Sequence, residues 1–494
     1  MIPGSCIAKA TSQINNNNHQ KSTPSKITRK RLPKPLQLVL ALQAVGLAAL
    51  TAFTGAKAEQ AKRETAYRAS ILHFLSDPAT TKDKSYEYIK DGLLIVRDGQ
   101  IVSAGPYKSS IAKLAKTSNV VNYSGYLITP GFVDAHVHYP QVEIIASYGE
   151  QLIEWLNTYV FPAERKYSNS QYAREKAEFF LSQLIKNGTT TALVFATVDP
   201  TSVNAFFEAA LAKNMRMIAG KVLMDRNAPA YLLDTPESGY QESLNLIKKW
   251  HGVGRLSYAI TPRFAPTSSP AQLQAAGRLK AEFPSAYVHT HLSENKNEIA
   301  WVKSLFPERK GYLDVYHHYG LTGPRSIFAH AVHLDPKDEV NTIIKTKSVL
   351  AFCPTSNLFL GSGLFPFRTL RDAGARIALG TDVGAGTSLS ILATLNEGYK
   401  VAQLQQQKLS PLEGFYLATL GGAQSLSLAD RIGNFLPGKE ADFIVLDPKA
   451  TAISKLRLDK SQTLEEMLFA LMILGDDRNI KATYVAGVKQ HEQP

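Results

Sequence analysis

Eight short apolar runs alternate with longer amphipathic segments through the middle of this 494-residue chain. The runs cover residues 127–138, 189–198, 215–224, 256–264, 286–292, 326–331, 348–353 and 376–382. Parallel strands need helical crossover connections, and intervening segments such as 171–186 and 271–282 are long enough to supply them. This order predicts an α/β fold in which the eight runs close into a parallel, TIM-like (β/α)8 barrel.

Strand-like segments also stand at both ends of the part of the chain that reads as ordered. These segments are 66–73, 93–97, 100–104, 442–446 and 482–486. Asp98-Gly99 separates the second and third of them, and such a pair supplies the positive φ angles of a tight hairpin turn. We therefore expect the two ends of the chain to pair into one small β-sandwich domain.

These patterns divide the chain into three predicted parts. Residues 65–127 and 432–494 form the small β domain, and residues 128–431 form the barrel. Residues 1–64 form a basic leader, predicted to be disordered because it is polar and acid-poor outside one apolar segment at 36–53.

The leader has the order of a secretory signal peptide, with a basic flank, an apolar run and small residues up to Ala58. Gln37 and Gln43 interrupt the run, which is marginal for a membrane span of about 20 apolar residues. Three interpretations remain open: export with cleavage after Ala58, an organellar transit peptide, or a tail without a role in a cytoplasmic protein. Membrane contact is expected only if the leader is retained as an anchor.

The charge of the chain does not indicate a nucleic-acid partner. The formal net charge is +13, but residues 1–58 hold eight Lys and Arg and no Asp or Glu, which leaves +5 for the rest. A net charge this small on so long a body predicts no nucleic-acid surface. The two cysteines, Cys6 and Cys353, exclude a disulfide framework and a thiolate metal cluster.

Polar residues end four of the predicted barrel strands, where burial is unfavourable unless they have partners. His136 and His138 stand two apart on one strand and so project to the same side. That pair alone is weak evidence for a metal. Later strands end in His291, His330 and Asp382, and active sites of such barrels lie at these strand ends. Together these residues predict a catalytic zinc site.

A carboxylate follows one of these histidines, since Glu294 stands three residues after His291 and can carry protons near a bound water. His289 projects to the same side as His291, so spacing does not say which is the ligand. The position nearer Glu294 favours His291, with His289 as a neighbour. Strand 256–264 offers no lysine to bridge two metals, and we interpret Lys221 as structural, so one metal ion is predicted.

With these residues in view, the chain from about Ala66 onward resembles the amidohydrolase superfamily and, within it, the guanine deaminase family. The superfamily features are PGFVDAHVH, HTHLSE, FAH and LGTD, in that order. More particular similarity lies in Gln141 and in segments 154–157, 161–164, 261–264, 353–357 and 475–478. The leader departs from the family, and so does Asp199, where relatives are expected to have histidine.

The resemblance implies a homodimer that hydrolyses guanine to xanthine and ammonia. We expect it in the cytoplasm, with export through the leader as the alternative. It implies one zinc ion per chain, bound by His136, His138, His291 and Asp382. Glu294, His330 and Asp382 would be catalytic, and Gln141, Arg263 and Phe264 would contact the purine. The alternatives are a related enzyme that deaminates another purine or an s-triazine, and a non-catalytic binding protein that keeps the barrel.

The implied purine contacts agree with hydrogen-bonding chemistry. The planar fork of Arg263 can donate to O6 or N7 of guanine, and Gln141 can accept from N1–H and donate to O6. Adenine would present an amine where Arg263 needs an acceptor, a buried mismatch of about 1–3 kcal/mol. The other zinc deaminase architecture needs H-x-E and P-C-x-x-C, and this sequence contains neither.

Overall fold

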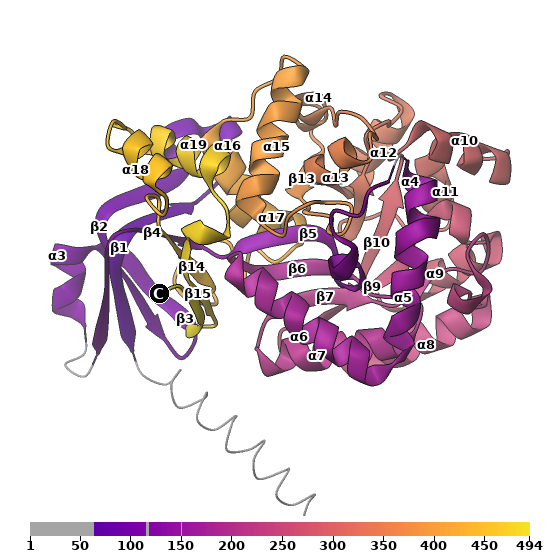
Figure 1. Cartoon of the computed structure of the whole chain (residues 1–494), viewed down its shortest axis with the longest axis horizontal. Helices are drawn as coiled ribbons and strands as arrows, with labels where there is room; N and C mark the ends of the chain where they lie inside the picture. The colour runs from indigo at the N-terminus through magenta and orange to yellow at the C-terminus, as the bar shows by residue number, and fades with distance from the viewer. Residues whose placement is uncertain (1–63, 115–117, 150) are drawn as a thin grey trace, which may run out of the picture. The chain divides into compact units, whose positions relative to one another are not determined.

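The computed structural model describes residues 64–114, 118–149 and 151–494. Its largest sheet is parallel and runs in the order β13-β12-β11-β10-β9-β7-β6-β5, with β8 paired to β9 (Figure 1). The strands are β5 (Phe132–His138), β6 (Thr189–Phe195), β7 (Arg216–Gly220), β8 (Val222–Leu223), β9 (Ser257–Pro262), β10 (Tyr287–Leu292), β11 (Ser326–His330), β12 (Val349–Phe352) and β13 (Arg376–Leu379). Every predicted run contributes to this sheet, and the third contributes two strands, β7 and β8.

The first and last strands meet just beyond β13, which nearly closes the sheet into a barrel. His138 N donates to Val383 O at 2.8 Å, and Asp382 N donates to His136 O at 2.9 Å. These bonds join the two chain segments that carry the predicted metal ligands. The predicted α/β barrel is therefore confirmed, and its closure lies at the candidate site.

Helices cover the outside of the barrel between successive strands. The longer ones are α6 (Ser170–Lys186), α7 (Pro200–Ala212), α8 (Pro236–Trp250), α9 (Pro270–Glu282), α10 (Lys296–Leu305), α11 (Tyr312–His318), α12 (Asp338–Thr346) and α15 (Ile391–Leu404). The predicted helices 171–186 and 271–282 match α6 and α9. In α6, Asn169 accepts from Gln171 N and Tyr172 N and so begins the helix, and its apolar stripe, including Phe180 and Leu184, is buried.

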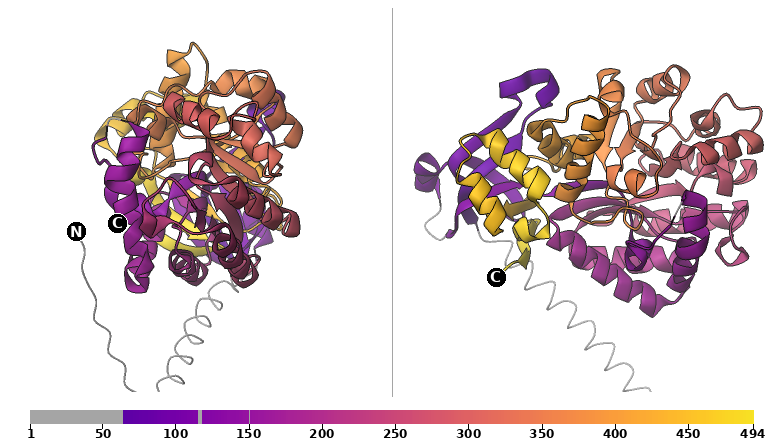
Figure 2. Two further views of the ribbon diagram at one scale, coloured as in Figure 1. Left: turned by 90° about the vertical axis from the view of Figure 1, so that its right-hand side faces the viewer. Right: turned by 45° about the horizontal axis from the view of Figure 1, so that its top comes forward.

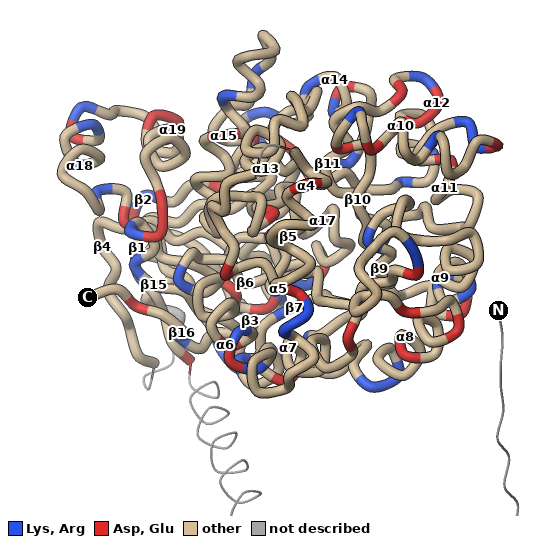
Figure 3. The backbone as a smooth tube through the Cα atoms, turned by 45° about the vertical axis from the view of Figure 1, so that its right-hand side comes forward, with Lys and Arg blue, Asp and Glu red and all other residues tan. Residues whose placement is uncertain are grey.

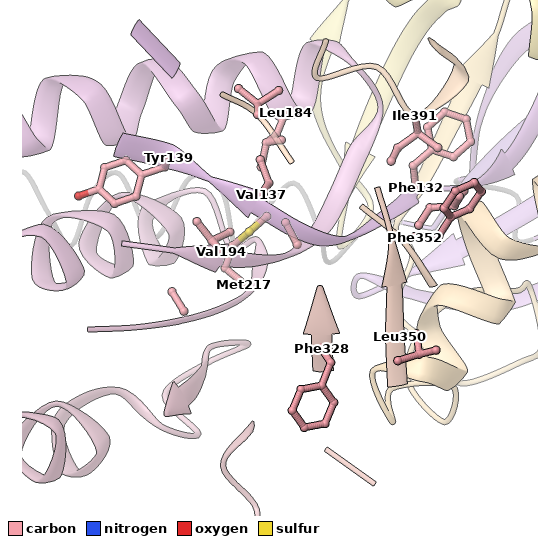
Figure 4. Packing of buried hydrophobic residues seen from close by; sticks show 14 of the residues in the cluster. Phe132, Val137, Tyr139, Leu184, Val194, Met217, Phe328, Leu350, Phe352 and Ile391 are labelled. Atoms are coloured by element: carbon pink, nitrogen blue, oxygen red, sulfur yellow. The ribbon is translucent and has the colours of Figure 1, made fainter. Parts of the chain in front are cut away.

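The main core lies between the strands and these helices, because alternate strand residues point outward to the helices. Figure 4 shows part of it: Val194 and Met217, from the neighbouring strands β6 and β7, lie side by side near Leu184 of α6, and Phe328 of β11 lies farther round the sheet. Burying one such side chain contributes about 1.5–3 kcal/mol. This core holds the strand ends, and the polar groups on them, in fixed positions.

The first predicted run, residues 127–138, is divided between the two sheets of the protein. Residues 127–130 belong to β4 (Asn119–Pro130), while β5 begins at Phe132. Gly131 makes the junction, and a Cβ atom there would lie 2.2 Å from Thr190 Oγ1. The sequence showed one apolar run because both halves are buried, although against different sheets.

A second, smaller sheet pairs the two ends of the described chain, in the order β16-β15-β14-β4-β1-β2-β3. Its strands, besides β4, are β1 (Thr65–Phe74), β2 (Tyr86–Arg97), β3 (Gln100–Pro106), β14 (Phe443–Leu446), β15 (Ile480–Val485) and β16 (Val488–Glu492). In Figure 2 the yellow C-terminal strands lie beside the indigo N-terminal ones, as the β14–β4 pairing requires.

The predicted hairpin turn between β2 and β3 is confirmed, with φ of 52° at Asp98 and 75° at Gly99. Ala441 N donates to Gly99 O at 2.8 Å, so this turn meets the C-terminal half of the sheet. Inside the curled sheet, the rings of Phe443 and Tyr484 stack with centroids 4.3 Å apart. The small β domain therefore forms from both ends of the ordered chain, as predicted.

Buried ion pairs join the small domain to the barrel at the amino ends of the strands. Arg255, just before β9, donates to Asp442 Oδ1 at 3.1 Å and through Nε to Glu440 Oε2 at 2.9 Å. Arg216 Nε also donates to Glu440 Oε2, at 2.9 Å. This junction lies at the end of the barrel opposite the candidate site.

None of the helices in the described ranges is long and apolar enough to cross a membrane. The apolar segment 36–53 and the predicted cleavage after Ala58 lie outside the described residues. Figure 3 shows Lys and Arg interspersed with Asp and Glu along the surface helices, in agreement with the small net charge of the body.

Candidate functional site

Four side chains from different strands converge at the carboxyl end of the barrel. One ligand atom each from His136, His291, His330 and Asp382 lies within 4.8 Å of the others. His138 Nε2 also reaches this group, at 3.2 Å from His136 Nε2 and 3.3 Å from His291 Nε2. The barrel therefore brings together all four predicted metal ligands, and His330 with them.

The spacing of these atoms fits a tetrahedral metal ion. Asp382 Oδ1 lies 3.0 Å from His136 Nε2 and 3.3 Å from His138 Nε2. Zinc–nitrogen bonds of about 2.0–2.1 Å at a tetrahedral angle place two ligand atoms about 3.3–3.4 Å apart. An imidazole and carboxylate set of this type suits zinc, so the residues present fit the ion.

The protonation states in the cluster are those that bind a metal. Burial lowers the pKa of His136 and His291, and it lowers the pKa of His138 to about 3. Burial raises the pKa of Asp382, but the adjacent His136 and the other histidines lower it further, to well below its usual range. Neutral imidazoles beside an ionised carboxylate need to lose no proton to ligate zinc.

Each of three imidazoles has a partner for Nδ1 on the side away from the cluster. His291 Nδ1 lies 2.7 Å from Arg263 O, and His330 Nδ1 lies 2.9 Å from Asn357 Oδ1. His136 Nδ1 lies 2.7 Å from His289 Nε2. When Nδ1 carries the proton, the lone pair of Nε2 faces the cluster, which is the arrangement that metal-binding histidines have.

The structure shows which of the two histidines of β10 can be a metal ligand, a choice that their spacing in the sequence did not decide. His291 Nε2 faces the cluster, whereas His289 lies behind His136 and packs on Phe195 with ring centroids 4.3 Å apart. His289 is fully buried. Only His291 is placed to touch an ion bound at the cluster.

Glu294 is buried next to the cluster, at the end of β10. His330 Nε2 lies 3.4 Å from its Oε2, and Ser362 Oγ donates to its Oε1 at 3.0 Å. Burial and the nearby charge of Asp382 raise the pKa of Glu294 to about 8, although the Ser362 bond opposes the shift. The carboxyl group therefore holds a proton at neutral pH that it can give to a substrate.

A small cavity opens beside these groups. Polar groups form one side, and apolar side chains form the rest: Leu152, Trp155, Leu156, Phe264, Leu360 and Ala385. Leu152 and Trp155 come from the helix α4 (Leu152–Trp155), and Leu156 begins the helical segment η4 (Leu156–Val160). Apolar walls around a few polar groups are typical of sites that bind small heterocyclic molecules.

The three predicted purine contacts all line this cavity. Arg263, at the end of β9, donates through Nη1 to both carboxylate oxygens of Glu164, at 2.8 and 2.9 Å. Gln141 Nε2 lies 3.4 Å from Glu164 Oε1, and its Oε1 accepts from Gly384 N at 3.3 Å. Phe264 packs edge-on against Trp301, with centroids 6.1 Å apart. A buried guanidinium on a fixed carboxylate is therefore available to an acceptor on the ligand.

Other polar residues singled out in the sequence lie apart from the cluster. Lys221 is fully buried, and its Nζ donates to Val198 O at 2.8 Å and Asp234 Oδ2 at 2.7 Å. Asp199 begins α7 by accepting from Thr201 N at 2.8 Å. Both contacts are structural, in agreement with the interpretation of Lys221.

Sequence reasoning missed three residues that support the site: Glu164, Asn357 and Ser362. Glu164 and Asn357 stand in segments that carried the family resemblance, and a buried acid or amide in such a segment was the available signal. Ser362 lies in the loop after the short helix α13 (Pro354–Phe359), and nothing in its sequence context distinguishes it.

Comparison with known proteins agrees with this geometry. Residues 127–489 match the model of the Amidohydrolase family. The chain is 59% identical over 406 residues to guanine deaminase of Escherichia coli, an alignment that covers 82% of this chain and 92% of the relative. The solved structure of E. coli guanine deaminase superposes with a TM-score of 0.84 at 54% identity, covering 87% of this chain and 99% of that one.

Two further solved structures with this fold contain a bound ligand. A guanine deaminase from C. acetobutylicum, with guanine bound in its active site, is 30% identical with a TM-score of 0.78 and covers 86% of this chain and 100% of that one. An adenosine deaminase from Xanthomonas campestris with bound zinc shares the fold at 21% identity and a TM-score of 0.76, covering 87% of this chain and 93% of that one.

Proposed function

Because the chain belongs to the amidohydrolase family and, within it, to the guanine deaminases, we propose that it hydrolyses guanine to xanthine and ammonia. The observation that carries this proposal is a single cavity lined both by proposed metal ligands and by Arg263, whose guanidinium is paired with the buried Glu164. The cluster suits hydrolysis, and the pair suits a planar base with a hydrogen-bond acceptor.

In this proposal one zinc ion per chain is held by His136, His138, His291 and Asp382. A zinc ion bound there would lower the pKa of water to about 7 and so supply a nucleophile at neutral pH. Asp382 is ionised and takes up the proton that the water loses. His330, held by Asn357, stands beside both carboxylates and orients the attacking oxygen.

Glu294 is the proposed proton carrier. It is protonated at neutral pH, so it donates to N3 of guanine as oxygen adds to C2. Its carboxylate then relays to the departing amine the proton that Asp382 took from the water, because the amine would otherwise be a poor leaving group. When the C2 hydroxyl becomes the carbonyl of xanthine, its proton returns to Glu294. Proton transfer by a positioned side chain contributes typically 10²–10⁴-fold to the rate.

Arg263 and Gln141 set the orientation of the base. Glu164 occupies Nη1 of Arg263, which leaves the other N–H groups of its fork to donate to O6 or N7. Gln141 contacts N1–H and O6, and Phe264 covers a face of the ring. Adenine would present an amine to Arg263 and leave a buried donor without an acceptor.

The test is a turnover assay on zinc-loaded full-length protein with guanine, adenine and an s-triazine as substrates. We expect xanthine and ammonia from guanine in equal amounts, and one zinc per chain by metal analysis. Glu294→Gln should keep its zinc and lose at least 100-fold in kcat. No xanthine from guanine would refute the substrate, two metals per chain would refute the single-ion site, and no turnover of any substrate would favour a binding protein.

We further propose a homodimer, an expectation supported by the family resemblance alone, and a cytoplasmic location. Sedimentation equilibrium of the purified protein measures the association state, and a monomer at micromolar concentration would contradict it. The mass of the mature N-terminus, isolated from cells, decides between a retained leader and cleavage after Ala58.

A further inference from the structure

We propose that His289 is a positioning residue that holds His136 in the tautomer a metal needs. The proposal rests on the proposed function, because it takes His136 to be a zinc ligand. His289 lies in the inner row of β10, two residues before His291, and its Nε2 is 2.7 Å from Nδ1 of His136. Both side chains are fully buried, so no solvent molecule competes for this contact.

The contact determines which nitrogen of His136 carries the proton. Nε2 of His136 faces Asp382 Oδ1 at 3.0 Å and the cluster, so Nε2 is the atom that would ligate. A neutral imidazole has one proton, and a ligating Nε2 requires that proton on Nδ1. Nδ1–H must then donate, and the atom within reach is Nε2 of His289, which accepts.

This arrangement leaves one polar atom of His289 itself without a hydrogen bond. Accepting through Nε2 places its proton on Nδ1, and Nδ1 has no hydrogen-bond partner among the described residues. A buried N–H without a partner is unfavourable, because the hydrogen bond that it makes to water in the unfolded chain is lost. A residue needed only to fill space beside Phe195 would be better apolar, so the cost points to a role for Nε2 as an acceptor.

His289 accepts as a neutral group, and so do the two groups that accept from Nδ1 of His291 and His330. His291 donates to the carbonyl of Arg263, and His330 donates to the amide of Asn357. A carboxylate in any of these places would make the ligand more basic. With neutral partners on the histidines, Asp382 is the charged group among the proposed ligands. The positive charge of a bound ion would then be offset less, and the ion would lower the pKa of water more.

The experiment measures zinc affinity of the metal-free full-length protein by competition with a chromophoric chelator. His289→Phe and His289→Leu remove the acceptor, whereas His289→Gln keeps an acceptor oxygen. We expect zinc to bind 10–100-fold more weakly to the first two variants and within about threefold of the parent to His289→Gln. The matched control is His251→Gln, a histidine at the end of α8 that contacts Tyr258 N and Ser285 instead.

Two further readouts separate positioning from folding and from the proposed function. The Tm of the metal-free variants reports packing, and the visible spectrum of the Co²⁺-loaded proteins reports ligand geometry, expected to change in His289→Phe and return in His289→Gln. Equal zinc affinity in parent and His289→Phe, or equal loss in all three variants, overturns the inference. Failure of the parent to bind zinc would instead refute the proposed function.

Discussion

Arg263 and Glu164 form an ion pair that is almost wholly withdrawn from water. Taking two charges out of water is unfavourable, and the pair recovers that free energy only while both partners are present. Arg263 lines the cavity, so the Glu164 carboxylate fixes one edge of its guanidinium while the other N–H groups remain for a ligand.

Glu164→Gln should therefore impair substrate binding more than chemistry. The amide cannot balance the charge of Arg263 or accept twice from Nη1, so the fork loses its orientation. We expect KM for guanine to rise at least 10-fold while kcat falls less than threefold. Steady-state kinetics measure both, with Glu175→Gln on the exposed face of α6 as the control. An unchanged KM would show that Arg263 is oriented by other contacts.

The histidine cluster makes the metal-free protein sensitive to acid. Burial lowers the pKa of His138 to about 3 in the folded state, against about 6.5 in an unfolded chain. The unfolded state therefore binds more protons below pH 6.5, and stability falls as the pH decreases from there. One such group contributes about 2 kcal/mol of lost stability by pH 5.

Urea unfolding of the metal-free protein at pH 7 and pH 5 measures whether the free energy of unfolding falls with pH as expected. The parent should lose more stability over this interval than His138→Gln, whose amide does not titrate. The same loss in both proteins would mean that His138 is not the source of the acid sensitivity.

At the scale of elements, the amino ends of the barrel strands are tied to the small sheet by Arg255, Arg216, Glu440 and Asp442. The carboxyl ends carry the candidate site. Stability and chemistry are thus placed at opposite ends of the same strands, a division typical of this architecture.

Arg255→Leu should destabilise the protein without changing its chemistry. The substitution leaves Asp442 buried without its charged partner, and breaking a buried pair costs about 3–5 kcal/mol. Denaturant unfolding measures the loss, and kcat of the folded variant should stay within twofold of the parent. Arg457→Leu, on the exposed helix α18 (Ala452–Leu458), is the control. A loss below 1 kcal/mol for Arg255→Leu would contradict this account.

At the scale of the whole molecule, the candidate metal site lies where the first and last strands of the barrel meet. His136 and His138 end the first strand, and Asp382 follows the last, where two backbone hydrogen bonds join them. An ion bound to all three would link the two edges of the sheet. Ligands that bind only the folded state stabilise it by mass action, about 4 kcal/mol at a concentration 1,000 times Kd.

Removing zinc should therefore lower Tm as well as abolish turnover. Differential scanning calorimetry of the protein before and after chelation, and again after zinc is restored, measures the effect. We expect Tm to fall by several degrees and to recover with zinc, while Mg²⁺ does not restore it. The same Tm in all three samples would mean that the ion does not bridge the closure.

Much of the fold could be predicted because its signals are local. Each barrel strand is a short apolar run, and Asp98-Gly99 is a turn whose φ angles depend on those two residues alone. The split of the first run at Gly131 could not be predicted, because both halves are buried and only their partner sheets differ. Family resemblance supplied the ligand set, since spacing alone left His289 and His291 equivalent.

By itself, the sequence determined where the strands and their terminal polar residues lie, because strand periodicity and burial are properties of short segments. Only the tertiary structure decided which of those residues meet. Glu164 contacts Arg263 across 99 positions of the chain, and His136 contacts His289 across 153. Such pairs depend on how the strands are staggered and closed, which no local pattern encodes, and the irregular pairing of β5 with β6 between Asp134 and Val137 shifts that stagger further.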